Sequence, residues 1–223
     1  MIVLLFGATG MVGEGVLREC LLDPVVEHVL AVGRTPTGRP HEKLEELTCP
    51  DLTQLGPVEG RLAGYDACFF CLGISSIGLS EPEFSRVTYD LTLSIAERLA
   101  RLNPGMTFVY VSGAGTDSSE RGRTMWARVK GRTENALLRL PFRAAYMFRP
   151  GVIQPVHGVR SKTRTYRAAY IVLWPIVALL LVVAPNSVTT TERVGKAMIR
   201  AARDGAPTRW VSTRDINALA RSP

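Results

Sequence analysis

An apolar run followed directly by three spaced glycines, "IVLLFGATGMVG", constrains the fold of this chain more than any other stretch of its sequence. The run at residues 2–6 predicts a buried strand, and the amphipathic residues 11–22 predict the helix that follows it. Gly7, Gly10 and Gly13 lie in the turn between the two. Glycine allows a positive φ and a close approach of the backbone to a pyrophosphate, and a helix N-terminus offers free N–H groups to phosphates. We therefore predict a phosphate-binding turn; the alternative is a tight strand–helix turn without a ligand.

Short apolar runs alternate with longer amphipathic stretches along the rest of the chain, without repeats or low-complexity tracts. This alternation is typical of a parallel sheet that is covered by helices on both faces. We predict an α/β fold with a doubly wound, mostly parallel sheet. Strands are expected at residues 2–6, 28–33, 46–49, 66–72, 107–112, 143–148 and 208–212. Helices are expected at residues 11–22, 84–102, 124–140 and 190–203.

The composition changes after Arg149, Pro150 and Gly151. We expect residues 1–150 to form a nucleotide-binding core. Residues 151–223 are expected to form a small C-terminal part that covers the substrate at the carboxyl edge of the sheet. This part is also expected to contribute the last strand of the sheet.

Arginine dominates the basic residues: of 27, only four are Lys, and the formal net charge is +7. The charges are spread along the chain without a dense run or interleaved aromatic residues, so a nucleic-acid partner is not expected. A dispersed positive surface fits an anionic small molecule. Cys68 and Cys71 form a C-x-x-C pattern, but strand alternation puts them on opposite faces. We interpret them as reduced core residues and expect no metal site.

The second predicted strand ends in "AVGRTPTGR", without the acidic residue that commonly holds the ribose 2′-hydroxyl of NAD. Arg34 stands there instead, with Arg39 nearby, and a guanidinium suits a 2′-phosphate. We therefore predict NADP(H) as the preferred cofactor and NAD(H) as the second option. The alternative is that Arg34 is an ordinary solvated loop charge.

Further motifs follow the predicted strands in order: GATGMVG (7–13), Asp51–Leu52, CLG (71–73), YVSGAG (110–115), WARVKGRTE (126–134) and RPGVIQP (149–155). Together they resemble the short-chain dehydrogenase/reductase superfamily in its atypical or extended, epimerase/dehydratase-like branch. Within it, the chain is similar to the Tat-interacting oxidoreductase-like proteins. The resemblance covers nearly the whole chain and implies an NAD(P)-binding Rossmann fold.

The resemblance also implies roles for single residues. Asp51 and Leu52 would lie near the adenine, with Leu72 and Gly73 along its ribose. Ser112 would touch the substrate carbonyl, Lys130 would bind the nicotinamide ribose, and residues 150–152 would lie beside the nicotinamide amide. The predicted cofactor-binding residues are therefore Gly7, Thr9, Gly10, Met11, Val12, Gly13, Arg34, Asp51, Leu52, Leu72, Gly73, Lys130, Pro150, Gly151 and Val152.

Trp126 departs from the pattern of the resemblance, which implies a catalytic set at Ser112, Trp126 and Lys130. The family has a tyrosine four residues before the lysine, and it donates the proton that accompanies hydride transfer. An indole N–H is too weak an acid to replace it. Either another group supplies the proton, with Tyr166, Tyr170 and His157 as candidates, or the chain binds its cofactor without fast turnover.

Residues 168–185 are almost entirely apolar, and no charged residue occurs between Ala168 and Thr191. The length approaches that of a membrane span, but Pro175 interrupts it and a predicted strand of the sheet follows it. We expect a pocket lid or the surface of a homodimer rather than membrane contact. The N-terminus resembles a strand more than a signal peptide, so a cytoplasmic location is expected.

We therefore expect an NADP(H)-dependent oxidoreductase or epimerase-like enzyme that acts on a small carbonyl substrate. The alternative is an NADP(H)-binding sensor or scaffold with little or no turnover. A titratable acid near Ser112 would favour the enzyme, and a pocket closed by Trp126 would favour the sensor.

Overall fold

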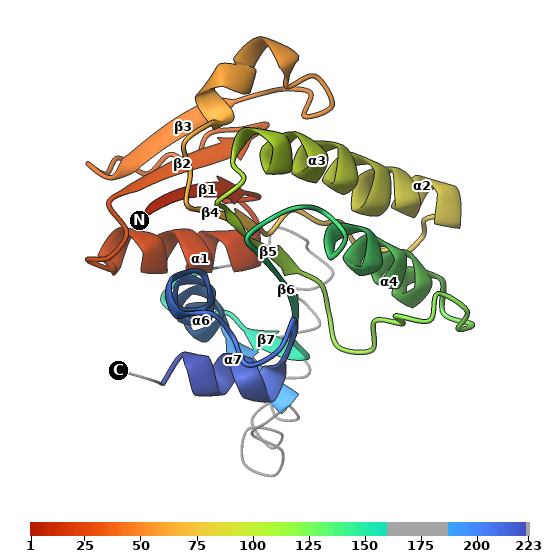
Figure 1. The fold of residues 1–223 in the computed structure, drawn as a ribbon. Helices are drawn as coiled ribbons and strands as arrows, with labels where there is room; N and C mark the ends of the chain where they lie inside the picture. Colours follow the sequence, from red (N-terminus) through yellow and green to blue (C-terminus); the bar gives the residue numbers. More distant parts are fainter. Residues whose placement is uncertain (160–186, 222–223) are drawn as a thin grey trace.

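The computed structural model describes residues 1–159 and 187–221. Within them, seven parallel strands form one sheet in the order β3-β2-β1-β4-β5-β6-β9 (Figure 1). The predicted doubly wound parallel sheet is therefore confirmed. The strands are β1 (Ile2–Phe6), β2 (His28–Gly33), β3 (Leu44–Thr48), β4 (Ala67–Phe70), β5 (Thr107–Val111), β6 (Ala144–Arg149) and β9 (Trp210–Ser212).

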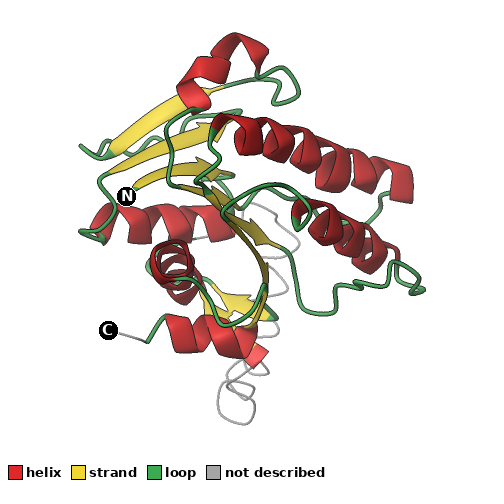
Figure 2. Cartoon of the chain, in the orientation of Figure 1, coloured by secondary structure: helices red, strands yellow, loops and turns green. Residues whose placement is uncertain are grey.

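Helices cover both faces of this sheet, as Figure 2 shows. One face carries α1 (Met11–Leu22), α6 (Thr191–Asp204) and α7 (Thr213–Leu219). The other face carries α2 (Glu81–Ser85), η2 (Arg86–Leu91), α3 (Thr92–Leu102) and α4 (Met125–Leu137). A short 3₁₀ helix, η1 (Gly56–Leu62), follows β3.

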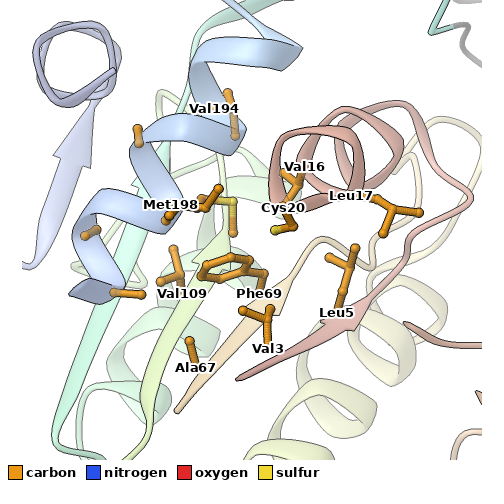
Figure 3. Packing of buried hydrophobic residues seen from close by; sticks show 14 of the residues in the cluster. Val3, Leu5, Val16, Leu17, Cys20, Ala67, Phe69, Val109, Val194 and Met198 are labelled. Atoms are coloured by element: carbon orange, nitrogen blue, oxygen red, sulfur yellow. The ribbon is translucent and has the colours of Figure 1, made fainter. Parts of the chain in front are cut away.

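The central strands are buried on both sides because their side chains alternate between two hydrophobic clusters. Val3 and Leu5 of β1 point towards α1 and α6, where they pack with Phe69, Val16 and Met198 (Figure 3). The other cluster lies under α3 and contains Leu4 and Phe6 of β1 together with a row of stacked phenylalanines. This two-sided burial explains why the strands read as continuous apolar runs.

The two cysteines of the C-x-x-C pattern lie beside different clusters. Cys68 belongs to the cluster under α3, and Cys71 packs against the one under α1 and α6. All four cysteines are free thiols. Burial raises the pKa of the Cys68 thiol, which disfavours its reactive thiolate form.

The structure differs from the predicted elements at several places. The strand expected at 46–49 is β3, which begins at Leu44 and ends at Thr48, and the helix η1 was not expected. The helix expected over 84–102 is divided into α2, a π-helical segment η2 and α3, and within it the Thr92 hydroxyl donates to the carbonyl of Val87 at 3.4 Å. Two short strands that were not predicted, β7 (Val152–Gln154) and β8 (Val188–Thr190), pair in parallel as a second sheet. The predicted strand at 208–212 is shortened to β9, and α7 follows it directly.

The residues beyond β6 supply both the edge strand β9 and the helix α6 that packs on α1. The predicted division of the chain at residue 150 remains a prediction. Residues 168–185, and with them Tyr170, lie outside the described residues, as does Tyr166. In the part of the chain that the structure describes, no helix is long and apolar enough to cross a membrane.

Helices α1 and α6 approach each other through glycines. A Cβ atom at Gly15 of α1 would lie 2.5 Å from the Cβ of Thr191, the first residue of α6. A Cβ at Gly195 of α6 would lie 3.2 Å from the Cα of Val16. Neither position has room for a side chain. The two glycines therefore allow the helices to pack close together.

We expect Gly15→Ala to lower the free energy of unfolding by about 1–3 kcal/mol, because the added methyl group overpacks the contact with Thr191. Replacing glycine by alanine inside a helix normally raises the free energy of unfolding, so the expected change has the opposite sign. Gly60→Ala is the matched control, since a methyl group there would meet no atom within 4 Å. That variant should be neutral or slightly stabilised in urea unfolding, and equal midpoints for the two variants would contradict the prediction.

Candidate cofactor site

A cleft of about 580 Å³ lies where β1, β2, β3 and β4 end. Its walls are the turn after β1 (residues 7–10), the end of β2 with its loop (31–37), part of β3 (46–48), Leu52, and residues 71–73 after β4. The strand order reverses between β1 and β4, and such a switch point is where α/β sheets bind ligands. The glycine turn predicted from the sequence therefore lies at this cleft.

The glycine turn is shaped by contacts that exclude side chains. Gly7 has a φ of +83°, and a Cβ there would lie 2.7 Å from the carbonyl carbon of Cys71. A Cβ at Gly13 would lie 2.1 Å from the carbonyl oxygen of Gly7. That oxygen accepts a hydrogen bond from the N–H of Gly10 at 2.9 Å. The first turn of α1 is thereby pressed against the end of β1.

The N-terminus of α1 is not capped by a side chain. Gly10 is its N-cap residue and has no side chain, and within the described residues the helix has no side-chain cap hydrogen bond. Gly7, Thr9 and Gly10 line the cleft, while Met11, Val12 and Gly13 form the first turn behind them. Free N–H groups and the positive end of the helix dipole therefore lie at the cleft, the arrangement that binds phosphate groups.

The loop after β2 brings the predicted arginine to the cleft. Arg34 is exposed and lines it, and no hydrogen bond or ion pair involves its guanidinium within the described ranges. Arg39 does not line the cleft, because its guanidinium pairs with Glu14 in the first turn of α1. One acidic residue that the sequence patterns missed, Glu46 of β3, also lines the cleft.

The predicted adenine-side residues are divided by the structure. Leu52, Leu72 and Gly73 line the cleft. Asp51 does not, because its carboxylate accepts hydrogen bonds from the N–H and hydroxyl of Thr53, at 2.9 and 2.7 Å. These hydrogen bonds hold the pKa of Asp51 below its usual value. The carboxylate therefore closes its own turn after β3.

The predicted catalytic residues meet where β5 ends, outside the lining of the 580 Å³ cleft. Lys130 Nζ donates a hydrogen bond to the carbonyl oxygen of Ser112 at 2.8 Å. The Ser112 hydroxyl is buried and lies 3.0 Å from the hydroxyl of Thr116. Trp126 is partly buried against Gly115, where a Cβ atom would lie 3.4 Å from the indole ring. The lysine, serine and indole thus surround one loop, residues 112–116.

A buried ion pair lies one helical turn beyond Lys130. Glu134 is fully buried, and its carboxylate is held by the guanidinium of Arg149 at the end of β6. Burial lowers the pKa of Lys130 to about 8, and the charge of Glu134 partly opposes that shift. Lys130 is therefore closer to releasing its proton at neutral pH than an ordinary lysine is.

The segment 150–152 is fixed at the end of β6. The carbonyl of Pro150 accepts a hydrogen bond from Ala114 at 2.8 Å, and the Gly151 N–H donates to the Thr213 hydroxyl at 2.8 Å. Val152 begins β7. The structure therefore connects this segment to the loop that carries Ser112. His157, a candidate proton donor, instead lies 2.8 Å from the carboxylate of Glu192.

Comparison with solved structures places this fold in a known class. The chain superimposes on MoeE5 in complex with UDP-glucose and NAD with a TM-score of 0.67, over 99% of this chain and 81% of that one, at 16% sequence identity. The protein has the Rossmann fold of the NAD(P)-binding short-chain dehydrogenase/reductase and epimerase proteins. No protein-family model matches the chain.

Two curated relatives narrow this class. The chain is 29% identical over 153 residues to protein HTATIP2 of Rattus norvegicus, covering 68% of this chain and 62% of that protein. It is 28% identical over 171 residues to the mitochondrial protein FMP52-2 of Scheffersomyces stipitis, covering 75% and 72%. It is thus a distant homologue of the HTATIP2 and FMP52 proteins, and the match spans somewhat less than two thirds of the rat protein.

We expect the Lys130 side chain to titrate near pH 8, because burial disfavours its charged form. The sequence contains only four lysines, so NMR of the protein labelled at the lysine side chains resolves them individually. The signal that disappears in Lys130→Arg should titrate near pH 8. If the signal lost in that variant titrates above pH 10, the expectation is wrong.

Proposed function

We propose that this protein binds NADP(H) and acts as an oxidoreductase or epimerase-like enzyme on a small carbonyl substrate. The observation that carries the proposal is the glycine turn, where the Gly7–Gly13 contact leaves the uncapped N-terminus of α1 facing the cleft. The residues fit a dinucleotide, because Gly7 and Gly10 leave the cleft side of the turn without side chains where a pyrophosphate would approach the backbone. The nicotinamide would supply hydride-transfer chemistry when bound.

Arg34 supports the choice of NADP(H). Arg34 lines the cleft directly after β2, and its guanidinium is not paired with an acid in the described part of the chain. A free guanidinium can bind a 2′-phosphate through two hydrogen bonds. NAD(H) is the second option, since MoeE5 is described in complex with NAD.

Lys130 and Ser112 are proposed for the nicotinamide end. Lys130 Nζ already donates to the Ser112 carbonyl, and an ammonium group has further N–H donors for ribose hydroxyls. That backbone hydrogen bond fixes the direction of the lysine side chain. The Ser112 hydroxyl, which shares a hydrogen bond with Thr116, would orient a substrate carbonyl.

The proton donor separates the enzyme from a second candidate function. Trp126 occupies the position four residues before Lys130, and its indole lies against the loop at Gly115. His157 is engaged by Glu192. These two observations favour a cofactor-binding sensor or scaffold with little turnover as the alternative function.

We further propose the surroundings in which this function operates. The partner is a small-molecule substrate, with no nucleic-acid role. The apolar residues 168–185 serve as a lid or as a homodimer surface, without stable membrane contact. We propose a cytoplasmic location, although the FMP52 relatives carry the designation mitochondrial in their names.

NADPH should bind at least about tenfold more tightly than NADH, a difference of about 1.4 kcal/mol. Arg34→Asp should narrow or reverse this ratio, because an acid replaces the guanidinium beside the 2′-phosphate. Arg209→Asp is the matched control, since Arg209 is exposed and lies next to β9, away from the cleft lining. Fluorescence titration gives both affinities. Equal binding of NADPH and NADH by the unmodified protein would contradict the proposed preference for NADP(H).

Substitutions at Lys130 and Trp126 should have different effects. Lys130→Ala should weaken NADPH binding by about 1–3 kcal/mol, because it removes a charge-assisted hydrogen bond to the ribose. Trp126→Tyr should leave binding nearly unchanged while it places a phenol one turn before the ammonium. Stopped-flow NADPH oxidation with a panel of small ketones then separates the two functions.

If the protein is a sensor, Trp126→Tyr should create weak reductase activity where the parent has none. If the parent is already an enzyme with another donor, the substitution should leave turnover unchanged or reduce it. Unchanged NADPH binding by Lys130→Ala would refute the role given to Lys130.

A further inference from the structure

Glu46 is an acidic residue inside the cleft to which the proposed function gives no role. It lies on β3 directly opposite Ala31 of β2, and both residues line the cleft together with Arg34. Glu46 Oε1 accepts a hydrogen bond from the N–H of Thr37, at 2.5 Å. Within residues 1–159 and 187–221, no further hydrogen bond engages its second oxygen, Oε2.

The contact with Thr37 determines how this carboxylate is presented. Thr37 belongs to the loop that carries Arg34, and both line the cleft. Oε1 of Glu46 therefore connects this loop to β3, while Oε2 can still accept a hydrogen bond from a ligand. Glu46 is partly buried, so its charge is less screened by water than that of a fully exposed side chain.

Arg34 and Glu46 act in opposite directions on the ligand proposed for this cleft. They form no ion pair with each other, so neither charge is cancelled by the other. A guanidinium attracts a 2′-phosphate, whereas a carboxylate repels it and accepts hydrogen bonds from free ribose hydroxyls. The end of β2 has no acid for that second purpose, and Glu46 provides one from the neighbouring strand.

We propose that Glu46 is a specificity-determining residue for the adenosine end of the cofactor. Its carboxylate favours an unphosphorylated ribose and limits the preference for a 2′-phosphate that Arg34 creates. This inference rests on the proposed function, because it assumes that the cleft holds a nicotinamide dinucleotide. It makes the selectivity of the site a balance between one residue of the β2 loop and one residue of β3.

The test uses two fragments that occupy only the adenosine end: 2′,5′-ADP and 5′-AMP. Their affinities are measured by isothermal titration calorimetry on the parent chain and on Glu46→Gln. Glutamine keeps an oxygen that can accept from the Thr37 N–H but carries no charge. We expect the affinity for 2′,5′-ADP relative to 5′-AMP to rise about three- to tenfold, because a repulsion at short range is removed.

Glu45→Gln is the matched control. It removes the same charge from the preceding residue of the same strand, whose carboxylate pairs with Arg61 and lies 3.2 Å from His28. Glu45 does not line the cleft. The ratio of the two affinities should therefore remain that of the parent chain.

An unchanged ratio in Glu46→Gln would overturn the inference, as would an equal change in Glu45→Gln, which would indicate a general effect of surface charge. Should the glutamine variant fail to fold, Glu46→Ala is measured instead, since it also removes the charge. If the parent chain binds neither fragment nor NADPH nor NADH, the proposed function fails instead, so the two failures are distinguishable.

Discussion

The contact between the Gly7 carbonyl and the α-carbon of Gly13 is the constraint on which the site depends. A side chain at Gly13 would overlap the Gly7 oxygen, and one at Gly7 would overlap the backbone that follows β4. With only hydrogen atoms there, α1 begins directly at the end of β1 and its N-terminus faces the cleft. The topology supports this geometry, because the strand order reverses between β1 and β4. The connections that follow these two strands run to opposite sides of the sheet, and a cleft remains between them.

The sequence was sufficient to predict the sheet because its central strands are buried on both faces. Such strands appear as uninterrupted apolar runs, and β1, β2 and β5 are found within one residue of their predicted bounds. The pair β7 and β8 could not be found in this way, since three residues are too few for a periodic pattern. The π-helical segment η2 was also missed, because its apolar spacing differs little from that of an α-helix.

The candidate site could be predicted where the backbone geometry admits only one residue type. It could not be predicted where the position of a side chain depends on the hydrogen bonds that it forms in the folded protein. The glycine turn belongs to the first kind. Asp51 belongs to the second, because its carboxylate binds its own turn and leaves the cleft wall to Leu52. Glu46 lies in a polar edge strand without a distinctive pattern, and only the register between β2 and β3 reveals that it enters the cleft.

The packing of α1 against α6 has a consequence for synthesis of the chain. Helix α1 presents Val16, Leu17 and Cys20 to the core, and α6, which covers them, is encoded far downstream. At typical elongation rates of about 5–20 residues per second, roughly 10–35 s separate the emergence of Gly15 from that of Gly195. During this interval the part of α1 that α6 covers in the folded protein lacks that cover, while β1 and β4 can already pack against the rest of its apolar side. This part of the apolar surface of α1 is therefore buried only after α6 has been synthesised.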